Sequence, residues 1–299
     1  MSGGGEVRAR IKSVSSTKKI TRAQELIASA RVVRARTTLE RTAPYDDEFV
    51  RLLGLLDRAS IPFDHPLLAP RETIRRAAVL VVASDRGFNG GYTGNVVRCA
   101  DRLDDELGRA GTETVYYVIG GKAVEYFRFH ERDVAHTWTG ETQNPSPETA
   151  ASIGSFLAES VVAGSDGTLT GFGGDVVPGL DAAYVVHSKF VSMIDQRPVS
   201  LRLAPVELPP EIVTTAADRA LEPEIDDVAP ALLARAVTSH VFAAMLDASV
   251  SDSAARRAAM NLATNNASEL LDDLHLRANK ERQAQVTQEL SEIVGDILS

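Results

Sequence analysis

The chain has 299 residues, of which 44% are hydrophobic and 24% are charged, and its formal net charge is −9. These proportions exclude a wholly disordered chain. The single cysteine, Cys99, excludes an internal disulfide and favours a reducing, cytoplasmic location. The longest strongly apolar run, Ala77–Ala83, is too short to cross a bilayer, and the first residues contain no apolar segment. We therefore expect no transmembrane segment and no secretory signal.

Residues 1–60 are predicted to form one long helix. Val7, Ile11 and Val14 are spaced by four and three residues, and a similar spacing resumes at Ile20, Ala23, Ile27 and Ala30. This narrow apolar stripe is typical of a helix that packs on one other helix. Pro44 is expected to bend or break the helix. The proline-containing segment 61–76 is expected to be a linker.

Residues 77–206 predict an α/β domain, because short apolar runs alternate with helical segments. Residues 164–179 contain six glycines and predict a flexible surface loop, and 207–227 predict a second linker. The expected strands are Ala77–Ala83, Val115–Ile119, Val134–Trp138, Ala182–Phe190 and Val199–Pro205. The expected helices are a segment ending at Leu107, Gly121–His130 and Pro147–Ala163.

Residues 228–299 predict a second long helix, with no proline after Pro230. Apolar residues recur at heptad spacing, which is typical of a coiled coil. These residues are Met260, Ala263, Ala267, Leu270, Leu274, Val286, Leu290, Ile293 and Ile297. The predicted fold class is α/β: a long antiparallel coiled coil of the N- and C-terminal helices plus a central Rossmann-like α/β domain.

Sites of chemistry are not evident. The turn Ser84–Gly91 follows an expected strand, where phosphate sites often lie, but it lacks the G-x-G-x-x-G spacing. The segment Gly120–Ala123 fails the P-loop pattern, because Tyr116 and Ala123 stand where Gly and Ser or Thr are required. No two histidines are spaced as metal ligands on a helix. We therefore expect no catalytic residue, no cofactor and no metal in this chain.

The head of the chain is basic: residues 1–41 contain ten Lys and Arg against three Asp and Glu. Residues 1–44 contain no aromatic side chain that could stack on a base, and the rest of the chain is acidic. The charge pattern therefore favours a protein partner with an acidic surface over nucleic acid, and leaves an ordinary solvated face as the other interpretation.

Four segments carry a family resemblance. They are Arg10–Val14 with Ser16–Ala23, then Ser84–Gly91, then Ser188–Phe190, and finally Asn279–Ala284 with Thr287–Val294. In this order they resemble the gamma subunit of F-type ATP synthases along the whole chain. The chain departs from the family at Gln24 and Leu26, where methionines are usual, and at Phe88-Asn89, where Leu-Cys is usual. Residues 164–179 resemble an insertion, which we expect to modulate rotation by touching the membrane c-ring or a neighbouring subunit.

The resemblance implies a non-catalytic rotor shaft that couples proton flow through the c-ring to ATP synthesis. The implied partners are three alpha and three beta subunits, the epsilon and delta subunits, and the c-ring. The implied location is peripheral, on the cytoplasmic face of the energy-transducing plasma membrane. The residues expected to contact the stator are Lys18, Lys19, Arg31, Arg34, Arg36, Arg256, Arg282, Gln283, Thr287 and Glu289.

Arg282 and Gln283 are the favoured contacts, because two polar residues interrupt the apolar stripe between Leu274 and Val286. Two alternatives stay open: a nucleotide-binding α/β enzyme, which would bind ATP or NAD, and a homo-oligomeric coiled-coil scaffold, which would form a stable homodimer.

Overall fold

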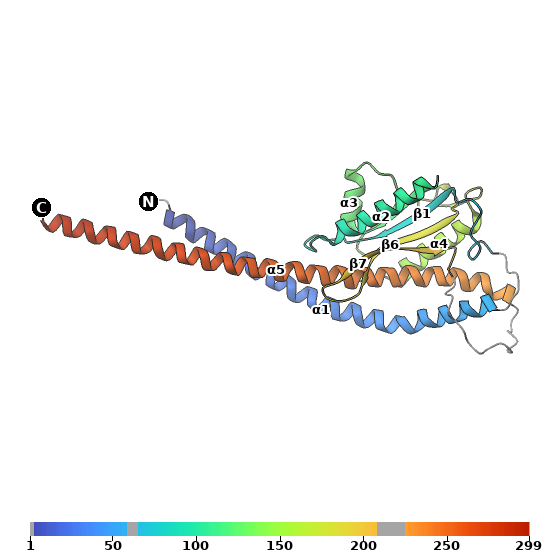
Figure 1. The fold of residues 1–299 in the computed structure, drawn as a ribbon, viewed down its shortest axis with the longest axis horizontal. Coiled ribbons are helices and arrows are strands. Elements are labelled where there is room, and N and C mark those ends of the chain that lie inside the picture. Colours follow the sequence, from blue (N-terminus) through green and yellow to red (C-terminus); the bar gives the residue numbers. More distant parts are fainter. Residues whose placement is uncertain (1–2, 59–64, 208–224, 299) are drawn as a thin grey trace. The chain divides into compact units, whose positions relative to one another are not determined.

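The computed structural model describes residues 3–58, 65–207 and 225–298; within them, the side chains of residues 3–4, 43–58, 225–227, 289 and 292–298 are not described. Its elements are α1 (Gly3–Arg58), β1 (Arg76–Val82), α2 (Tyr92–Arg109), β2 (Glu113–Ile119), α3 (Gly121–Phe129), β3 (Val134–Trp138), α4 (Pro147–Ala163), β4 (Thr168–Thr170), β5 (Val176–Pro178), β6 (Ala182–Phe190), β7 (Gln196–Ala204) and α5 (Ile225–Leu298), shown in Figure 1.

A five-stranded sheet forms the centre of the α/β part, in the order β3-β2-β1-β6-β7. The first four strands are parallel, and β7 pairs antiparallel with β6 at one edge. The predicted strands are confirmed, and the central strand β1 is buried on both faces, as its continuous apolar run indicates. The order and the antiparallel edge strand were not predicted.

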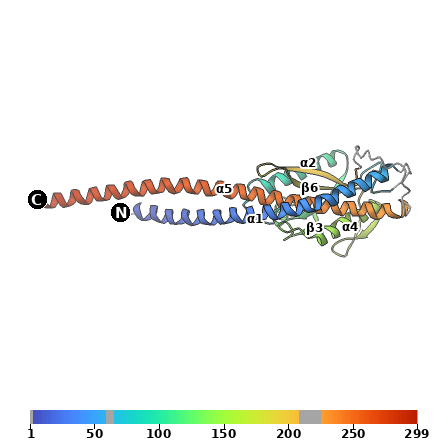
Figure 2. The same ribbon diagram turned by 90° about the horizontal axis from the view of Figure 1, so that it is seen from below.

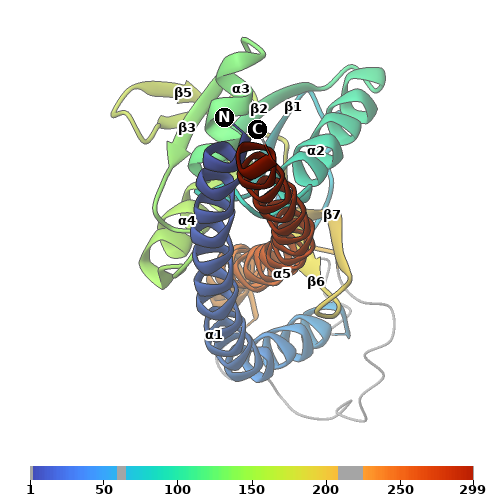
Figure 3. The same ribbon diagram turned by 90° about the vertical axis from the view of Figure 1, so that its left-hand side faces the viewer.

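Helices cover both faces of the sheet. Ala77, Val79 and Val81 of β1 pack with α2 and α3, whereas the alternate residues Ala78 and Leu80 pack with α4 and α5. Successive strand residues point to opposite faces, so β1 contributes to both cores. The end-on view in Figure 3 shows α2 and α4 on opposite sides of the sheet.

The first part of α5 is a core helix of the α/β domain. Leu233, Val237, Val241 and Met245 are buried in the core on the α4 side of the sheet. By length and composition alone, the helical stretch Val228–Gln288 could cross a membrane, because its most apolar 18-residue window has a mean hydropathy of 1.4. The sequence analysis considered only uninterrupted apolar runs and so did not single out this part of the helix. Packing on a sheet explains this hydropathy, since a buried core helix is equally apolar.

Residues 164–179 are not the flexible loop that was expected. They contain β4 and β5, which form a two-stranded antiparallel hairpin. The ring of Phe172 packs 4.5 Å from Phe156 and 5.0 Å from Trp138, measured between ring centroids. At the base of the hairpin, Ser165 N–H donates to the buried carboxylate of Asp181 at 3.0 Å. The glycine content indicated turns in this segment, whereas the packing of Phe172 holds the segment as a regular hairpin.

Pro44 does not end the first helix, since α1 continues to Arg58. The expected linkers fall partly outside the described residues, at 59–64 and 208–224. By packing, the chain forms two compact units, residues 1–29 with 256–299 and residues 30–255. The first half of α5 therefore packs with the sheet, and the second half packs with the start of α1.

Candidate functional site

The glycine turn before α3 is occupied by the protein's own atoms. The backbone N–H of Gly121 donates to Asp85 Oδ1 at 3.0 Å, and that of Lys122 donates to the Ser84 carbonyl at 2.9 Å. These N–H groups begin a helix, where a phosphate would be held in a nucleotide-binding protein. The Asp85 carboxylate takes that position, so the turn is a structural joint between β1 and α3.

The electrostatics of Asp85 fit this structural role. Burial raises the pKa of its carboxyl, but hydrogen bonds from Gly140, Gly121 and Thr142 outweigh that effect, so the pKa lies below its ordinary value. Gly120 has φ of 113°, and a Cβ on it would lie 2.9 Å from the Ser84 backbone. Only glycine allows β1 and this turn to approach so closely.

The start of α1 and the second half of α5 form an antiparallel helical pair. Thr264 Oγ1 donates to Thr21 Oγ1 at 2.8 Å, and Asn261 Nδ2 donates to Glu25 Oε1 at 3.1 Å. The partner number on α5 falls as the number on α1 rises, so the two helices run in opposite directions. Figures 1 and 2 show these segments side by side.

The buried stripe of α1 differs from the predicted one by a single position. Ile20 and Ile27 are 63% and 46% exposed, whereas Thr21, Glu25 and Ala28 are buried. The spacing that starts at Val7, Ile11 and Val14 therefore continues through Lys18, Thr21, Glu25 and Ala28 without a break. The prediction failed because it followed apolar residues, and two of the buried positions are polar residues whose partners lie on α5.

Glu25 is the buried charge of this helical pair. Its carboxylate also accepts a hydrogen bond from Arg22 at 2.8 Å. Burial raises the pKa of Glu25, but the bonds from Asn261 and Arg22 and the charges of Arg22 and Arg257 outweigh it, so the pKa is lowered. Sequence reasoning missed Glu25 and Asn261. The spacing of Glu25 could have indicated its burial, because Glu25 lies seven residues after Lys18 and eleven after Val14 and so continues the stripe that starts at Val7.

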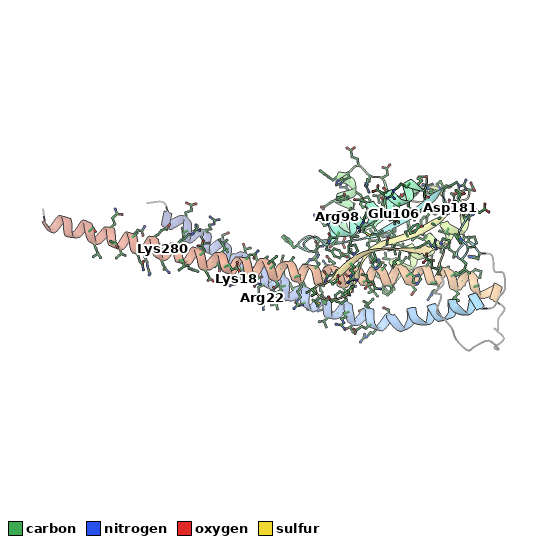
Figure 4. The ribbon with its side chains drawn as sticks, in the orientation of Figure 1. Lys18, Arg22, Arg98, Glu106, Asp181 and Lys280 are labelled. Carbon is green, nitrogen blue, oxygen red and sulfur yellow. The ribbon has the colours of Figure 1, made fainter. Side chains whose placement is uncertain are left out.

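The outer face of the pair carries both cations and apolar side chains. Lys19 is exposed and Lys18 is partly buried, beside exposed Ile20 and Ile27. Lys18 and Arg22 of α1 and Lys280 of α5 are labelled in Figure 4. Leu262 and Leu276 of α5 are also exposed, each at 62%. Large apolar side chains that recur exposed along a helical pair are typical of a surface that binds another protein.

The far part of α5 holds the favoured contact residues. Leu274 is buried, whereas Val286 and Leu290, which were expected in a buried heptad stripe, are 49% and 58% exposed. Arg282, Gln283 and Thr287 are exposed on this same part of the helix, and the Thr287 hydroxyl donates to the Gln283 carbonyl at 2.9 Å. The side chain of Glu289 lies outside the described residues.

Arg31, Arg34 and Arg36 belong to the other compact unit. Arg31 and Arg34 line a groove of about 310 Å³ with Gln143, Asn144 and Ser249. Arg36 is paired with Glu40 at 2.7 Å on the exposed side of α1. The structure therefore brings two of these arginines to one concave surface, which has no carboxylate among its described lining residues.

Arg256 does not fit the surface role predicted for it. Its side chain is only 5% exposed, at a position of α5 four residues before the buried Met260. The prediction rested on the family resemblance, which does not show whether a side chain is buried. Its burial makes it part of the packing within this chain.

Comparisons with known proteins agree along the whole chain. The model of a family described as ATP synthase matches residues 4–297. The ATP synthase gamma chain of Saccharopolyspora erythraea is 46% identical over 297 residues, covering 98% of this chain and 96% of that one. The ATP synthase gamma chain of Mycolicibacterium smegmatis is 44% identical over 293 residues, covering 97% and 95%.

Solved structures share the fold. A chain from the Euglena gracilis mitochondrial ATP synthase, OSCP/F1/c-ring, aligns with a TM-score of 0.61 at 18% identity, covering 99% of this chain and 94% of that one. A chain from the Tetrahymena thermophila mitochondrial ATP synthase central stalk and c-ring aligns with a TM-score of 0.57 at 16% identity, covering 82% and 99%.

Proposed function

The chain belongs to the ATP synthase gamma chain family, and from this premise we propose that it is the central rotor shaft of a proton-translocating F-type ATP synthase. It is a non-catalytic subunit that couples proton flow through a membrane ring to ATP synthesis at other subunits. A shaft acts by making different contacts with each of several catalytic subunits, so that their binding sites take different conformations.

The observation that carries this proposal is the outer face of the helical pair. Ile20 and Ile27 are exposed next to Lys19, although the pair has already buried a separate stripe of its own. A two-helix scaffold would bury its most apolar stripe between its own helices. Here that stripe faces outward, which supports a surrounding protein sleeve with apolar and acidic contact groups.

We propose that the antiparallel pairing extends as a coiled coil beyond the two observed contacts. If the register of Thr21 with Thr264 continues, the first described turn of α1 lies near Arg282. Beyond that level Val286 and Leu290 need a partner from another subunit, and their exposure supports this arrangement.

The proposed stator contacts are the residues of the predicted set that are exposed or, for Lys18 and Arg31, partly exposed. In the helical pair these are Lys18, Lys19, Arg282, Gln283 and Thr287, and in the α/β unit Arg31, Arg34 and Arg36. Their charges suit acidic loops of the catalytic subunits. Glu289 stays in the proposed set on its sequence match alone, and Arg256 is left out because it is buried.

The finer assignments rest on family membership. We propose that residues 1–60 and 228–299 form the shaft, and that 77–206 form the foot next to the c-ring. The proposed partners are three alpha and three beta subunits, epsilon, delta and the c-ring, on the cytoplasmic face of the plasma membrane. The hairpin within 164–179 is proposed to touch the c-ring or a neighbouring subunit and modulate rotation.

Affinity purification from native membranes tests the proposal. A tagged chain replaces the natural one, the membranes are solubilised with detergent, and the mass and subunit composition of the purified complex are measured by native mass spectrometry. We expect one copy of this chain with three alpha and three beta subunits. A homodimer without ATPase subunits would support the scaffold instead, and a free chain that binds ATP or NAD would support the enzyme.

A further inference from the structure

The crevice at the carboxyl ends of β1 and β6 is filled by helix α5. From β1 the chain passes through α2, on one face of the sheet, to β2. It reaches β6 from α4, on the other face, by way of the β4–β5 hairpin. Open α/β sheets usually bind ligands at such a point, where the strand order reverses. In this chain α5 residues Asp247–Asp252, which we name the anchoring turn, bond to the loops and strand ends around this crevice.

On the β1 side, two bonds join the anchoring turn to the start of α2. Asn89 Nδ2 donates to Asp252 Oδ1 at 2.8 Å, and the Tyr92 hydroxyl donates to the Ala248 carbonyl at 3.0 Å. Asp252 is 1% exposed, and Asn89 and Tyr92 are each 5% exposed. These contacts exclude water, so each bond is stronger than it would be at the surface.

On the β6 side, the anchoring turn is bonded to residues at the end of the strand. The Ser251 hydroxyl donates to the Ser188 carbonyl at 2.8 Å, and the Phe190 N–H donates to Asp247 Oδ1 at 3.3 Å. The buried ring of His187 lies 3.8 Å from the same carboxylate, measured from Nε2 to Oδ2. The anchoring turn is therefore bonded to β6 on one side and to the loop and helix that follow β1 on the other.

Directional bonds add to the apolar packing of α5 in this region. The buried apolar residues include Ala244, Ala248 and Ala254 together with the larger Met245, Leu246 and Val250. Apolar contacts hold the helix against the sheet, but they are not directional. Hydrogen bonds lose strength steeply when their angle changes, and here they hold the helix from two sides.

We propose that the anchoring turn is the torque-transmitting contact between the sheet and α5, with Asn89 and Asp252 as its positioning pair. This inference rests on the proposed rotor function, because it assigns the residues through which the foot drives the shaft. The compact unit that contains the sheet ends at Ala255, three residues after Asp252. The anchoring turn therefore lies at the end of the part of α5 that belongs to this unit.

Exchanging the two residues supplies a sharp test. The single variant Asn89→Asp places two carboxylates together and breaks the bond, whereas Asn89→Asp combined with Asp252→Asn restores an amide–carboxylate pair in the reverse sense. Asp181→Asn is the matched control, because Asp181 is equally buried at the opposite, amino-terminal end of β6. Each variant is assembled into the whole enzyme in membrane vesicles.

The readout is the ratio of ATP-driven proton pumping to ATP hydrolysis. We expect Asn89→Asp to lower the ratio about fivefold, the exchanged pair to restore it, and Asp181→Asn to leave it unchanged. A normal ratio in Asn89→Asp, an equal fall in Asp181→Asn, or an exchanged pair that restores nothing would overturn the inference.

Hydrogen exchange on the isolated full chain separates this inference from the proposed function. Asn89→Asp should speed exchange of the backbone amides of residues 247–252, and the exchanged pair should slow it again. Unchanged exchange would overturn the contact even if the complex assembles. Failure to recover ATPase subunits with the wild-type chain would instead count against the rotor function.

Discussion

Glu25 of α1 and Asn261 of α5, 236 residues apart, meet through a hydrogen bond of 3.1 Å in which the amide donates to a buried carboxylate. Such a polar pair fixes the register of two helices, because sliding either helix by one turn leaves both groups unpaired. A double-mutant cycle with Glu25→Ala and Asn261→Ala should give a coupling energy of about 1 kcal/mol in urea unfolding of the full chain. Additive single effects would show that the pair does not hold the register.

Gly154 of α4 is expected to be essential for close packing on α5. A Cβ on this glycine would lie 2.5 Å from the Thr238 Cα, so backbone would have to move. We expect Gly154→Ala to lower the free energy of unfolding by about 1–3 kcal/mol. Gly108→Ala in α2 is the control, since a Cβ there meets nothing within 4 Å and should add roughly 0.5–1 kcal/mol of helix stability. Equal effects of the two substitutions would refute close packing as the cause.

Acid should destabilise the α/β domain through Asp85 and Asp181. For Asp181, burial raises the pKa, but backbone bonds from Ser165, Arg75 and Arg76 outweigh it, and the net shift is downward. The same direction holds for Asp85. A lowered folded-state pKa stabilises the protein above the unfolded pKa of about 4, and this contribution is lost as the pH falls through the folded value.

The measurement is the urea midpoint as a function of pH. Asp181→Asn should cost about 2 kcal/mol at pH 7, because it weakens a buried acceptor of several N–H groups. It should also flatten the fall in stability from about pH 5 downward. A variant that keeps the wild-type acid slope would show that Asp181 does not cause it.

Much of the α/β part could be predicted from sequence, whereas the buried face of α1 could not. The strands at Ala77–Ala83 and Ala182–Phe190 were predicted correctly, because burial on both faces demands a largely apolar run. The α1 stripe was misplaced because Thr21 and Glu25 are buried by virtue of partners more than 200 residues away. The hairpin at 164–179 was missed because its order depends on Phe172 finding an aromatic cluster. Both errors concern contacts that are distant along the chain.

Arg282 and Gln283 remain the favoured stator contacts on α5. Both side chains are exposed, so replacing them with alanine should leave the helix folded. We expect Arg282→Ala with Gln283→Ala to lower the rate of ATP synthesis by the assembled enzyme severalfold. This corresponds to a loss of about 1 kcal/mol of interaction free energy between the chain and the stator. Glu269→Ala with Asp272→Ala, an exposed pair on the same helix, is the control. Unchanged synthesis in the first pair would remove it from the contact set.

Photo-crosslinking from Ile20 tests the central claim most directly. Ile20 is 63% exposed on the outer face of the helical pair, so a photoreactive side chain can replace it without disturbing the buried stripe. In the membrane-bound complex we predict covalent capture of an alpha or beta subunit, with ATP hydrolysis lost in proportion to the crosslinked fraction. Capture of only a second copy of this chain, with hydrolysis unaffected, would contradict the account of a shaft enclosed by catalytic subunits.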